Sequence, residues 1–205
     1  MTSPGSSFAL YVDGAIEDER DRRVVEEHLE SVKPLLEQRR EVRAGGMPWY
    51  RLHWPRRRAE QLGPKIVCAR RGAGLAFGLD LSGAVVSSDC TYLVLARECE
   101  RPIEALVRIL VALHLPEMER DLEVFGKRKG ELFEFYSQPL RDMPLPLVFA
   151  DGVFMFDSSA LGSERVDALE EVVSRAMVVI DAGRVDRFEL DRPRVHAELD
   201  RRANV

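Results

Sequence analysis

Apolar and polar positions repeat with two periods along the chain, and they divide it into helical and strand-forming stretches. Between Ile16 and Arg43, apolar residues recur every three or four positions with charge on the opposite face, which predicts helix. Because Pro34 inside this stretch removes a helical hydrogen bond, we expect two consecutive helices. Upstream, residues 8–14 predict a short strand that ends in an Asp-Gly turn. Residues 1–7, rich in Ser, Gly, Pro and Thr, are expected to form a disordered tail.

The middle of the chain changes to runs rich in β-branched and aromatic residues, which predict four strands. These runs are residues 65–70, 75–81, 84–87 and 91–96. The turn residues Asp80-Leu81-Ser82-Gly83 indicate that the second and third runs form a hairpin. Residues 103–115 return to helical period behind Pro102, which suits a helix N-terminus.

The last third of the chain mixes short apolar segments with helical ones. Lys127-Arg128-Lys129-Gly130 is predicted to be a basic loop, and residues 131–136 alternate like a strand. A proline-rich segment, 139–146, precedes a short apolar piece, and helices are expected from near Ser163 and after Pro193. The pattern therefore predicts an α+β fold, with a twisted, mainly antiparallel sheet, flanking helices and a helical C-terminal segment.

The composition is that of an ordinary globular protein. Of 205 residues, 45% are hydrophobic and 32% charged, and no apolar run approaches the roughly 18 residues of a membrane span. The start, MTSPGSS, has neither the basic nor the apolar part of a secretory signal, so we expect a cytoplasmic protein without membrane contact. Three cysteines without a CxxC pair and four separated histidines predict free thiols, no disulfide and no metal site.

The net charge of −5 is unevenly distributed. Residues 46–80 contain seven basic and two acidic side chains, which gives this segment +5 and leaves −10 for the remainder. A cationic cluster in an acidic chain creates a local field that attracts phosphate. The distribution therefore favours nucleic-acid binding even though the total charge is negative.

Motifs that would carry catalysis do not occur in the sequence. The glycines of residues 72–78 match neither GxGxxG nor GxxxxGK[ST], and there is no GxSxG. No lysine has an acidic residue two positions before it, as in two-metal nucleases. The Pro-Pro element with which adenine methyltransferases hold the flipped base is also missing. We therefore predict no catalytic residue and no cofactor site in this chain.

Residues 47–58, Met-Pro-Trp-Tyr-Arg-Leu-His-Trp-Pro-Arg-Arg-Arg, combine aromatic and basic side chains. Arginine forks onto guanine edges and phosphates, and aromatic rings stack on bases, so this composition suits DNA recognition. For the arginines we favour DNA contact over a solvated rim. For Trp49, Tyr50 and Trp54 we favour the alternative interpretation, that they anchor a core.

Five elements in order carry a family resemblance. They are the helix HLESVKPLLEQRREVR (28–43), WYRLHWPR (49–56), the KIV strand (65–67), the segments FGLD (77–80) and VSSDCTY (86–92), and the closing LRDMPLP (140–146). Their order and content resemble the TaqI-like C-terminal specificity domain, the target-recognition domain of adenine-specific DNA methyltransferases and fused restriction-modification enzymes. The resemblance covers about residues 8–146, and the catalytic domain of that family has no counterpart in this chain.

The resemblance implies a domain that reads a short double-stranded DNA sequence while a methyltransferase catalytic subunit flips and methylates adenine. S-adenosylmethionine would then bind that missing domain and not this chain. The side chains expected to contact DNA are Arg51, His53, Arg56, Arg57, Arg58, Arg70, Arg71, Lys127, Arg128 and Lys129. Residues 147–205 would form a C-terminal helical extension, packed on the same body or forming an interface.

Two other functions remain open. The chain could be a protein-interaction module, a specificity-subunit-like remnant that pairs with a separate methyltransferase or forms a homodimer through its C-terminal helices. It could also be a nuclease that uses clustered acids, namely Glu117, Glu119, Asp121 and Glu123. Carboxylates at these positions spread around a helix axis instead of converging, which disfavours the nuclease.

Overall fold

The protein is a mixed α+β structure in which every strand pair of the described chain is antiparallel. The computed structural model describes residues 10–72, 74, 76–183 and 185–190. The chain forms two compact units, Met1–Ala59 and Glu60–Val205. Within the described residues, no helix combines the length and apolarity needed to span a membrane.

The first unit is built mainly from short helices. They are α1 (Glu19–Leu29), the 3-10 turn η1 (Glu30–Val32), α2 (Lys33–Glu37) and α3 (Arg40–Arg43). Asp18 caps α1 by accepting a hydrogen bond from the Asp21 backbone N–H at 2.9 Å. Pro34 lies in the first turn of α2, where a missing N–H costs little, so the predicted interruption is confirmed.

The strand predicted at residues 8–14 is wrong for the described part of that segment. Residues 10–14 form no strand, and residues 8 and 9 lie outside the described chain. The segment instead makes single contacts: the Leu52 N–H donates to the Val12 carbonyl at 2.9 Å. One backbone hydrogen bond does not make the repeated pairing of a strand ladder, so the apolar alternation is not enough to form one.

The strands of the second unit form three sheets. The largest has the order β4-β1-β3-β9, the second β2-β6-β5, and the third is the pair β7-β8. The strands are β1 (Lys65–Ala69), β2 (Arg71–Gly72), β3 (Phe77–Asp80), β4 (Cys90–Leu93), β5 (Lys127–Lys129), β6 (Leu132–Glu134), β7 (Leu147–Ala150), β8 (Val153–Phe156) and β9 (Arg187–Glu189). The predictions of strands near 65–70, 75–81, 91–96 and 131–136 are confirmed.

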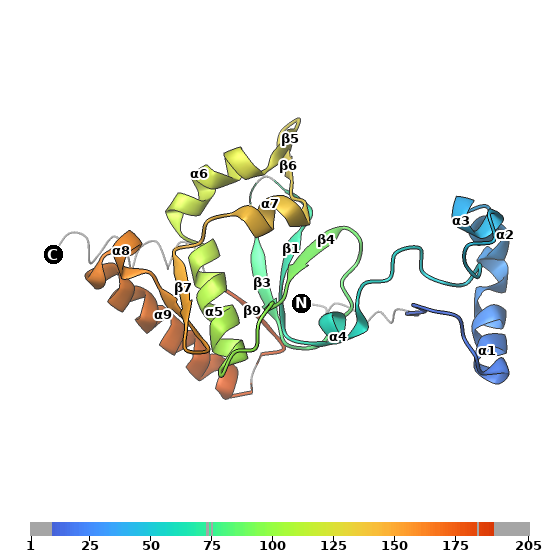
Figure 1. Cartoon of the computed structure of the whole chain (residues 1–205), viewed down its shortest axis with the longest axis horizontal. Helices are drawn as coiled ribbons and strands as arrows, with labels where there is room; N and C mark the ends of the chain where they lie inside the picture. The colour runs from blue at the N-terminus through green and yellow to red at the C-terminus, as the bar shows by residue number, and fades with distance from the viewer. Residues whose placement is uncertain (1–9, 73, 75, 184, 191–205) are drawn as a thin grey trace, which may run out of the picture. The chain divides into compact units, whose positions relative to one another are not determined.

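The helices of this part of the chain cover the sheets and carry much of the core. They are α4 (Arg58–Leu62), which begins in the first unit, α5 (Pro102–Leu113), α6 (Pro116–Phe125), α7 (Ser137–Asp142), α8 (Ser158–Leu161) and α9 (Ser163–Asp181). Helix α5 lies between the large sheet and α9 (Figure 1). Its Leu110 and Val111 are fully buried, as is Leu169 of α9, and each such side chain contributes roughly 1.5–3 kcal/mol. Arg108 of α5 also donates to the Glu170 carboxylate of α9 at 2.8 and 2.9 Å.

Two predictions around turns are wrong. Residues 84–87 form no strand, and β3 pairs instead with β1 and with β9, which the sequence analysis did not predict. The loop after β3 is held away from the sheet, because the Val86 N–H donates to the Gln61 side chain of α4 at 2.7 Å. The basic loop predicted at residues 127–130 is mostly strand β5, and Gly130, with φ of 67°, makes the turn into β6 together with Glu131. The helix predicted after Pro193 lies outside the described residues.

Candidate nucleic-acid interface

The small sheet β2-β6-β5 brings together two basic clusters that are far apart in sequence. In its register, Arg71 of β2 and Lys127 of β5 flank Glu134 of β6 from either side. Residues directly opposite each other in an antiparallel pair point to the same face, so these three side chains share one face. Lys129 joins them because it follows Lys127 by two positions.

This face of the small sheet is turned to solvent. The other face of β6 carries Phe133, which packs against the hydrophobic core and stacks near the buried Phe135, with ring centroids 6.1 Å apart. Lys127 and Lys129 are exposed, and so is Arg128, whose side chain belongs to the opposite face near the hairpin turn. The β5-β6 hairpin projects from the rest of the unit (Figure 1). A projecting two-stranded ribbon has the dimensions that a DNA major groove admits.

Arg71 is bound to the carboxylate beneath it. Its Nε donates to Oε1 of Glu134 at 2.8 Å, and its Nη2 lies 2.8 Å from the same oxygen. The Glu134 side chain is 5% exposed, whereas that of Arg71 is 60% exposed. Hydrogen bonds from Tyr136 and Arg71 lower the pKa of Glu134, so the carboxylate is ionised at neutral pH.

Arg70 lies next to this pair and stacks on an aromatic ring. Its guanidinium carbon is 4.7 Å from the centroid of the Tyr136 ring, within the range of a cation–π contact. The hydroxyl of Tyr136 donates to Oε2 of Glu134 at 2.7 Å. The Arg70 backbone joins β1 to the small sheet, because its N–H donates to Asp89 and its carbonyl accepts from Phe135, both at 2.8 Å.

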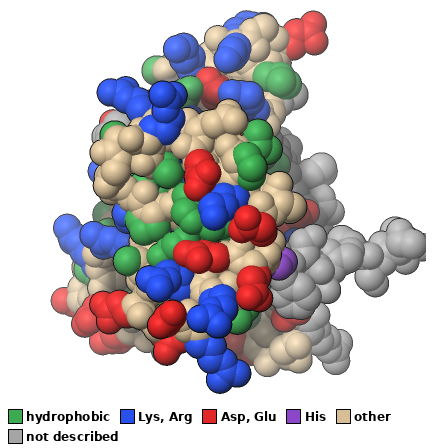
Figure 2. All heavy atoms as spheres, turned by 90° about the vertical axis from the view of Figure 1, so that its right-hand side faces the viewer, with side chains coloured by type: hydrophobic (Ala, Val, Ile, Leu, Met, Phe, Trp, Pro, Cys, Tyr) green, Lys and Arg blue, Asp and Glu red, His purple; other side chains and the backbone are tan. Residues whose placement is uncertain are grey.

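The polar residues on the two faces and flanks of this small sheet, which we call the basic sheet, are Arg70, Arg71, Lys127, Arg128, Lys129, Glu134 and Tyr136. Glu131 lies beside it in the hairpin turn, and with this residue counted the five cations and two carboxylates leave a net charge of +3. Figure 2 shows several Lys and Arg side chains at the top of the view, the level at which Figure 1 places β5 and β6. A local surplus of positive charge on a protein of net charge −5 can attract a polyanion.

Neither the scan against protein-family models nor the search of curated proteins found a match.

The remaining predicted contact residues belong to the first unit, where Arg51 and His53 have identified partners. Arg51 donates through Nε to the Asp13 carbonyl at 2.9 Å. His53 places Nε2 3.1 Å from a carboxylate oxygen of Glu41, an ion pair when the imidazole is protonated. These contacts order both side chains near residues 10–14 and α3.

The other three predicted arginines lie at the end of the first unit. Arg57 and Arg58 are exposed, and Arg56 is half-buried, with its carbonyl accepting a hydrogen bond from the Tyr11 hydroxyl. The exposed pair suits phosphate contact. The +5 segment 46–80 is thus divided: Arg51 to Arg58 lie in the first unit, and Arg70 and Arg71 lie in the basic sheet of the second.

The aromatic residues of the first unit differ in their environments. Tyr50 is 9% exposed and Trp49 lies half-buried against it, with ring centroids 5.8 Å apart, as expected for core anchors. Trp54 is 83% exposed, so its prediction as a core anchor is wrong. Its ring stacks on His53 at 4.2 Å and leaves the remainder of its surface open to solvent.

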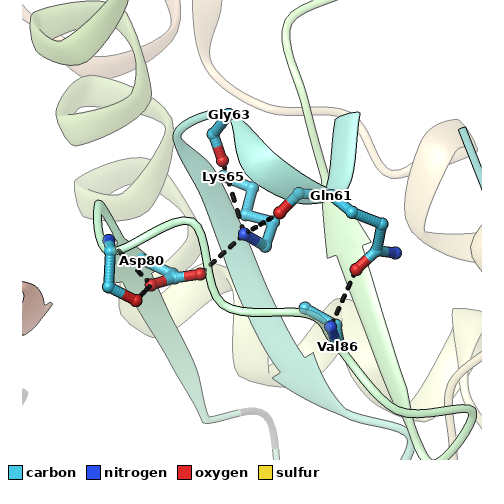
Figure 3. Close-up of polar contacts among 6 residues, drawn as sticks. Gln61, Gly63, Lys65, Asp80 and Val86 are labelled. Carbon is cyan, nitrogen blue, oxygen red and sulfur yellow. Dashed lines mark hydrogen bonds and ion pairs between the residues drawn. The ribbon is translucent and has the colours of Figure 1, made fainter. Parts of the chain in front are cut away.

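A second polar cluster lies inside the large sheet (Figure 3). Lys65 of β1 is completely buried, and its Nζ lies 2.6 Å from Oδ2 of Asp80 and 2.6 Å from the Gln61 carbonyl. Asp80 in turn accepts hydrogen bonds from the Ser82 N–H and hydroxyl at 3.1 and 2.6 Å. This lysine counted toward the basic segment in the sequence, but its burial removes it from any DNA-contacting surface.

A cavity of about 590 Å³ lies beside this cluster. Val67, Gly78, Asp80, Val86, Arg187 and Glu189 are among its lining residues. Its size is within the range of small-molecule pockets, roughly 300–1,000 Å³. Because Asp80 is bound by Lys65 and Ser82, we assign the cavity no part in contact with DNA.

One acidic residue of the nuclease alternative, Glu117, is engaged by an arginine of another helix. Both carboxylate oxygens of Glu117 accept hydrogen bonds from Arg165 of α9. Across the described residues, no three His, Cys, Asp or Glu side chains are grouped so that they could hold a metal ion.

Cys68, Cys90 and Cys99 are free thiols, and burial raises the pKa of Cys68 to about 12.

Sequence reasoning missed Glu134 and Tyr136 as parts of the site. Both lie in a segment whose alternation predicts a strand, Glu-Leu-Phe-Glu-Phe-Tyr, and both occupy the polar phase of that alternation. The signal that they share a face was therefore present. The partner strand β2 could not be predicted from the sequence, because it is only two residues long.

Proposed function

We propose that this chain is the sequence-specific DNA recognition module of an adenine-specific DNA methyltransferase or restriction-modification system. It would act with a catalytic domain that is not part of this sequence. Two independent arguments support the proposal. The first is the ordered family resemblance over residues 8–146, and the second is the basic sheet.

The basic sheet is the observation on which the proposal depends most. Arg70 and Arg71 are more than fifty positions from Lys127, yet the β2-β6-β5 register sets them on one small sheet. Arginine and lysine on a solvent-facing sheet provide the phosphate contacts that position a protein on a duplex. Arg128 on the projecting hairpin is the side chain that we assign to the groove, where guanine N7 and O6 accept a bidentate arginine.

The proposal assigns no chemistry to this chain. S-adenosylmethionine and the flipped adenine would bind the catalytic partner, which we place with this protein in the cytoplasm. The module would supply affinity and register, so that the adenine presented to the partner is the one in the recognised sequence.

A binding selection tests this function. The full chain is mixed with a pool of duplexes that contain a randomised central segment, and the bound duplexes are recovered and sequenced over several rounds. The proposal predicts enrichment of a short motif, and a duplex with that motif should bind at least about 10³-fold more tightly than a scrambled one. Recovery of an unenriched pool contradicts sequence-specific recognition.

The interaction module is retained as a second candidate because of one feature of α9. Val178 and Val179, near its C-terminal end, are 71% and 42% exposed, although the helix buries five other apolar residues. Exposed neighbouring valines on a helix provide a small self-association surface. Light scattering coupled to size exclusion separates the candidates, because a homodimer through α9 gives twice the 23.3 kDa mass and reverts to monomer in Val178→Glu.

A further inference from the structure

Glu134 poses an electrostatic problem for a surface that binds phosphate. It lies at the centre of the basic sheet, between Arg71 and Lys127, and it is ionised because hydrogen bonds from Tyr136 and Arg71 lower its pKa. A carboxylate at this place repels phosphate and reduces the net charge of the surface. On charge alone, its removal should strengthen DNA binding.

The contacts of Glu134 indicate the opposite. Both of its oxygens are engaged, since Oε1 accepts a hydrogen bond from Arg71 and Oε2 accepts one from the Tyr136 hydroxyl. The residue is 4% exposed, so the carboxylate lies beneath the cations and is screened from anything that binds above them. The guanidinium of Arg71 uses one edge for Glu134 and has further N–H donors with which to meet a phosphate.

The second oxygen extends this effect to another arginine. By accepting the Tyr136 hydroxyl at 2.7 Å, Glu134 fixes the ring on which the Arg70 guanidinium stacks at 4.7 Å. One buried carboxylate therefore orders both arginines that follow β1. Long side chains lose conformational freedom when they bind, so ordering them beforehand lowers that cost.

We propose that Glu134 is a positioning residue, which holds Arg71 directly and Arg70 through Tyr136 in the orientations that contact DNA phosphates. This inference rests on the proposed function. It assigns the DNA-binding surface an acidic residue whose loss weakens binding.

The chain offers a matched control in Glu131. This residue follows Gly130 in the same hairpin and is exposed. Glu131→Gln and Glu134→Gln remove the same charge from the same sheet. Tyr136→Phe removes only the hydroxyl that links Glu134 to the ring, so it tests the second half of the inference with a smaller disturbance of the fold.

The experiment measures affinity for a fluorescent duplex, at several salt concentrations, for the wild-type full chain and these three variants. Circular dichroism first confirms that each variant is folded. We expect Glu131→Gln to bind as tightly as wild type or slightly more tightly. Glu134→Gln and Tyr136→Phe should bind about 5-fold more weakly, and in Glu134→Gln the log–log salt slope should become shallower by about 0.9, the loss of one phosphate contact.

A measurement without DNA tests whether Glu134 orders the Arg71 side chain. The Nε–H resonance of Arg71 should show a rigid side chain by ¹⁵N relaxation in wild type and in Glu131→Gln, and a mobile one in Glu134→Gln.

Equal or tighter binding by a folded Glu134→Gln, with the slope unchanged or steeper, overturns the inference while leaving the proposed function intact. Failure of the wild-type chain to bind any duplex overturns both. If Glu134→Gln does not fold, Tyr136→Phe decides: wild-type affinity overturns the inference, and the 5-fold loss supports it.

Discussion

The Lys65 ammonium and the Asp80 carboxylate lie 2.6 Å apart, with side-chain exposures of 0% and 6%. They are Cα partners in the β1-β3 ladder, so the ion pair connects two central strands of the large sheet. Burial opposes ionisation of Asp80, but hydrogen bonds from Lys65 and Ser82 outweigh it and lower the pKa of the carboxyl. The pair therefore stabilises the fold. Lys65 belongs to the basic segment of the sequence but is not exposed to bind DNA.

Breaking this pair from one side should destabilise the protein strongly. Lys65→Met leaves the Asp80 carboxylate buried without its cation, and we expect the free energy of unfolding to fall by about 3–5 kcal/mol. Lys65→Met combined with Asp80→Leu removes both charges and should recover much of that loss. Urea unfolding of the three proteins checks this prediction. A double variant less stable than the single one would contradict it.

The lowered pKa of Asp80 also predicts the direction of an acid effect. A carboxyl whose pKa is lower in the folded than in the unfolded state stabilises the fold above its unfolded pKa, about 3.9. That contribution is lost as pH falls through the folded pKa. The stability difference between wild type and the Lys65→Met/Asp80→Leu variant should therefore shrink below about pH 4. A difference that stays constant from pH 6 to pH 2 in urea unfolding would show that Asp80 is not responsible.

Two glycines with positive φ should respond differently to the same change. Gly83 has φ of 70°, and a Cβ there would lie 2.8 Å from the Leu62 carbonyl oxygen. Gly130 has φ of 67° and open space around it. Gly130→Ala should cost about 1 kcal/mol from backbone strain alone, whereas Gly83→Ala should cost about 3 kcal/mol because the backbone of α4 must move. Thermal unfolding compares them, and equal shifts in Tm would contradict the close approach.

Trp54 should affect DNA binding without affecting stability. Because its side chain is 83% exposed, Trp54→Ala should change the free energy of unfolding by less than about 0.5 kcal/mol. We expect duplex affinity to fall about 5-fold, equivalent to roughly 1 kcal/mol of contact. The protein has two tryptophans, so Trp49→Phe leaves Trp54 as the only indole reporter. Unchanged fluorescence of Trp54 on DNA addition, together with unchanged affinity of Trp54→Ala, would exclude it from the interface.

The sequence predicted those parts of the fold whose signals are local. Helix α5 begins at Pro102 and its apolar residues recur every three to four positions, and Pro34 interrupts the first helical stretch, so both features could be predicted. Strand pairing was not predictable in the same way. Residues 84–87 include two β-branched valines and follow turn-forming residues, yet Gln61 holds Val86 away from the sheet, and β9 becomes the neighbour of β3. These are long-range contacts without a local signature.

The candidate site was likewise predictable only where the signal is local. Which side chains are cationic can be read from the sequence, but which of them are exposed cannot. Lys65 is buried by its pairing with Asp80, whereas Lys127 and Lys129 are exposed because the opposite face of the hairpin carries the packed Phe133. Arg71 lies on the same sheet face as Lys127 because it belongs to strand β2. The two residues of β2 are too few to produce a periodic pattern in the sequence.

The salt dependence of duplex binding tests the central claim, that the basic sheet contacts phosphates. The comparison is between wild type, a triple variant with Lys127, Arg128 and Lys129 changed to alanine, and a control in which the exposed Arg20, Arg22 and Arg23 of α1 are changed instead. If about six cations of the protein meet phosphates, the log–log slope for wild type should be near −5. The triple variant should be shallower by about 2–3, and the control should match wild type. A slope that is the same for wild type and the triple variant would contradict the account.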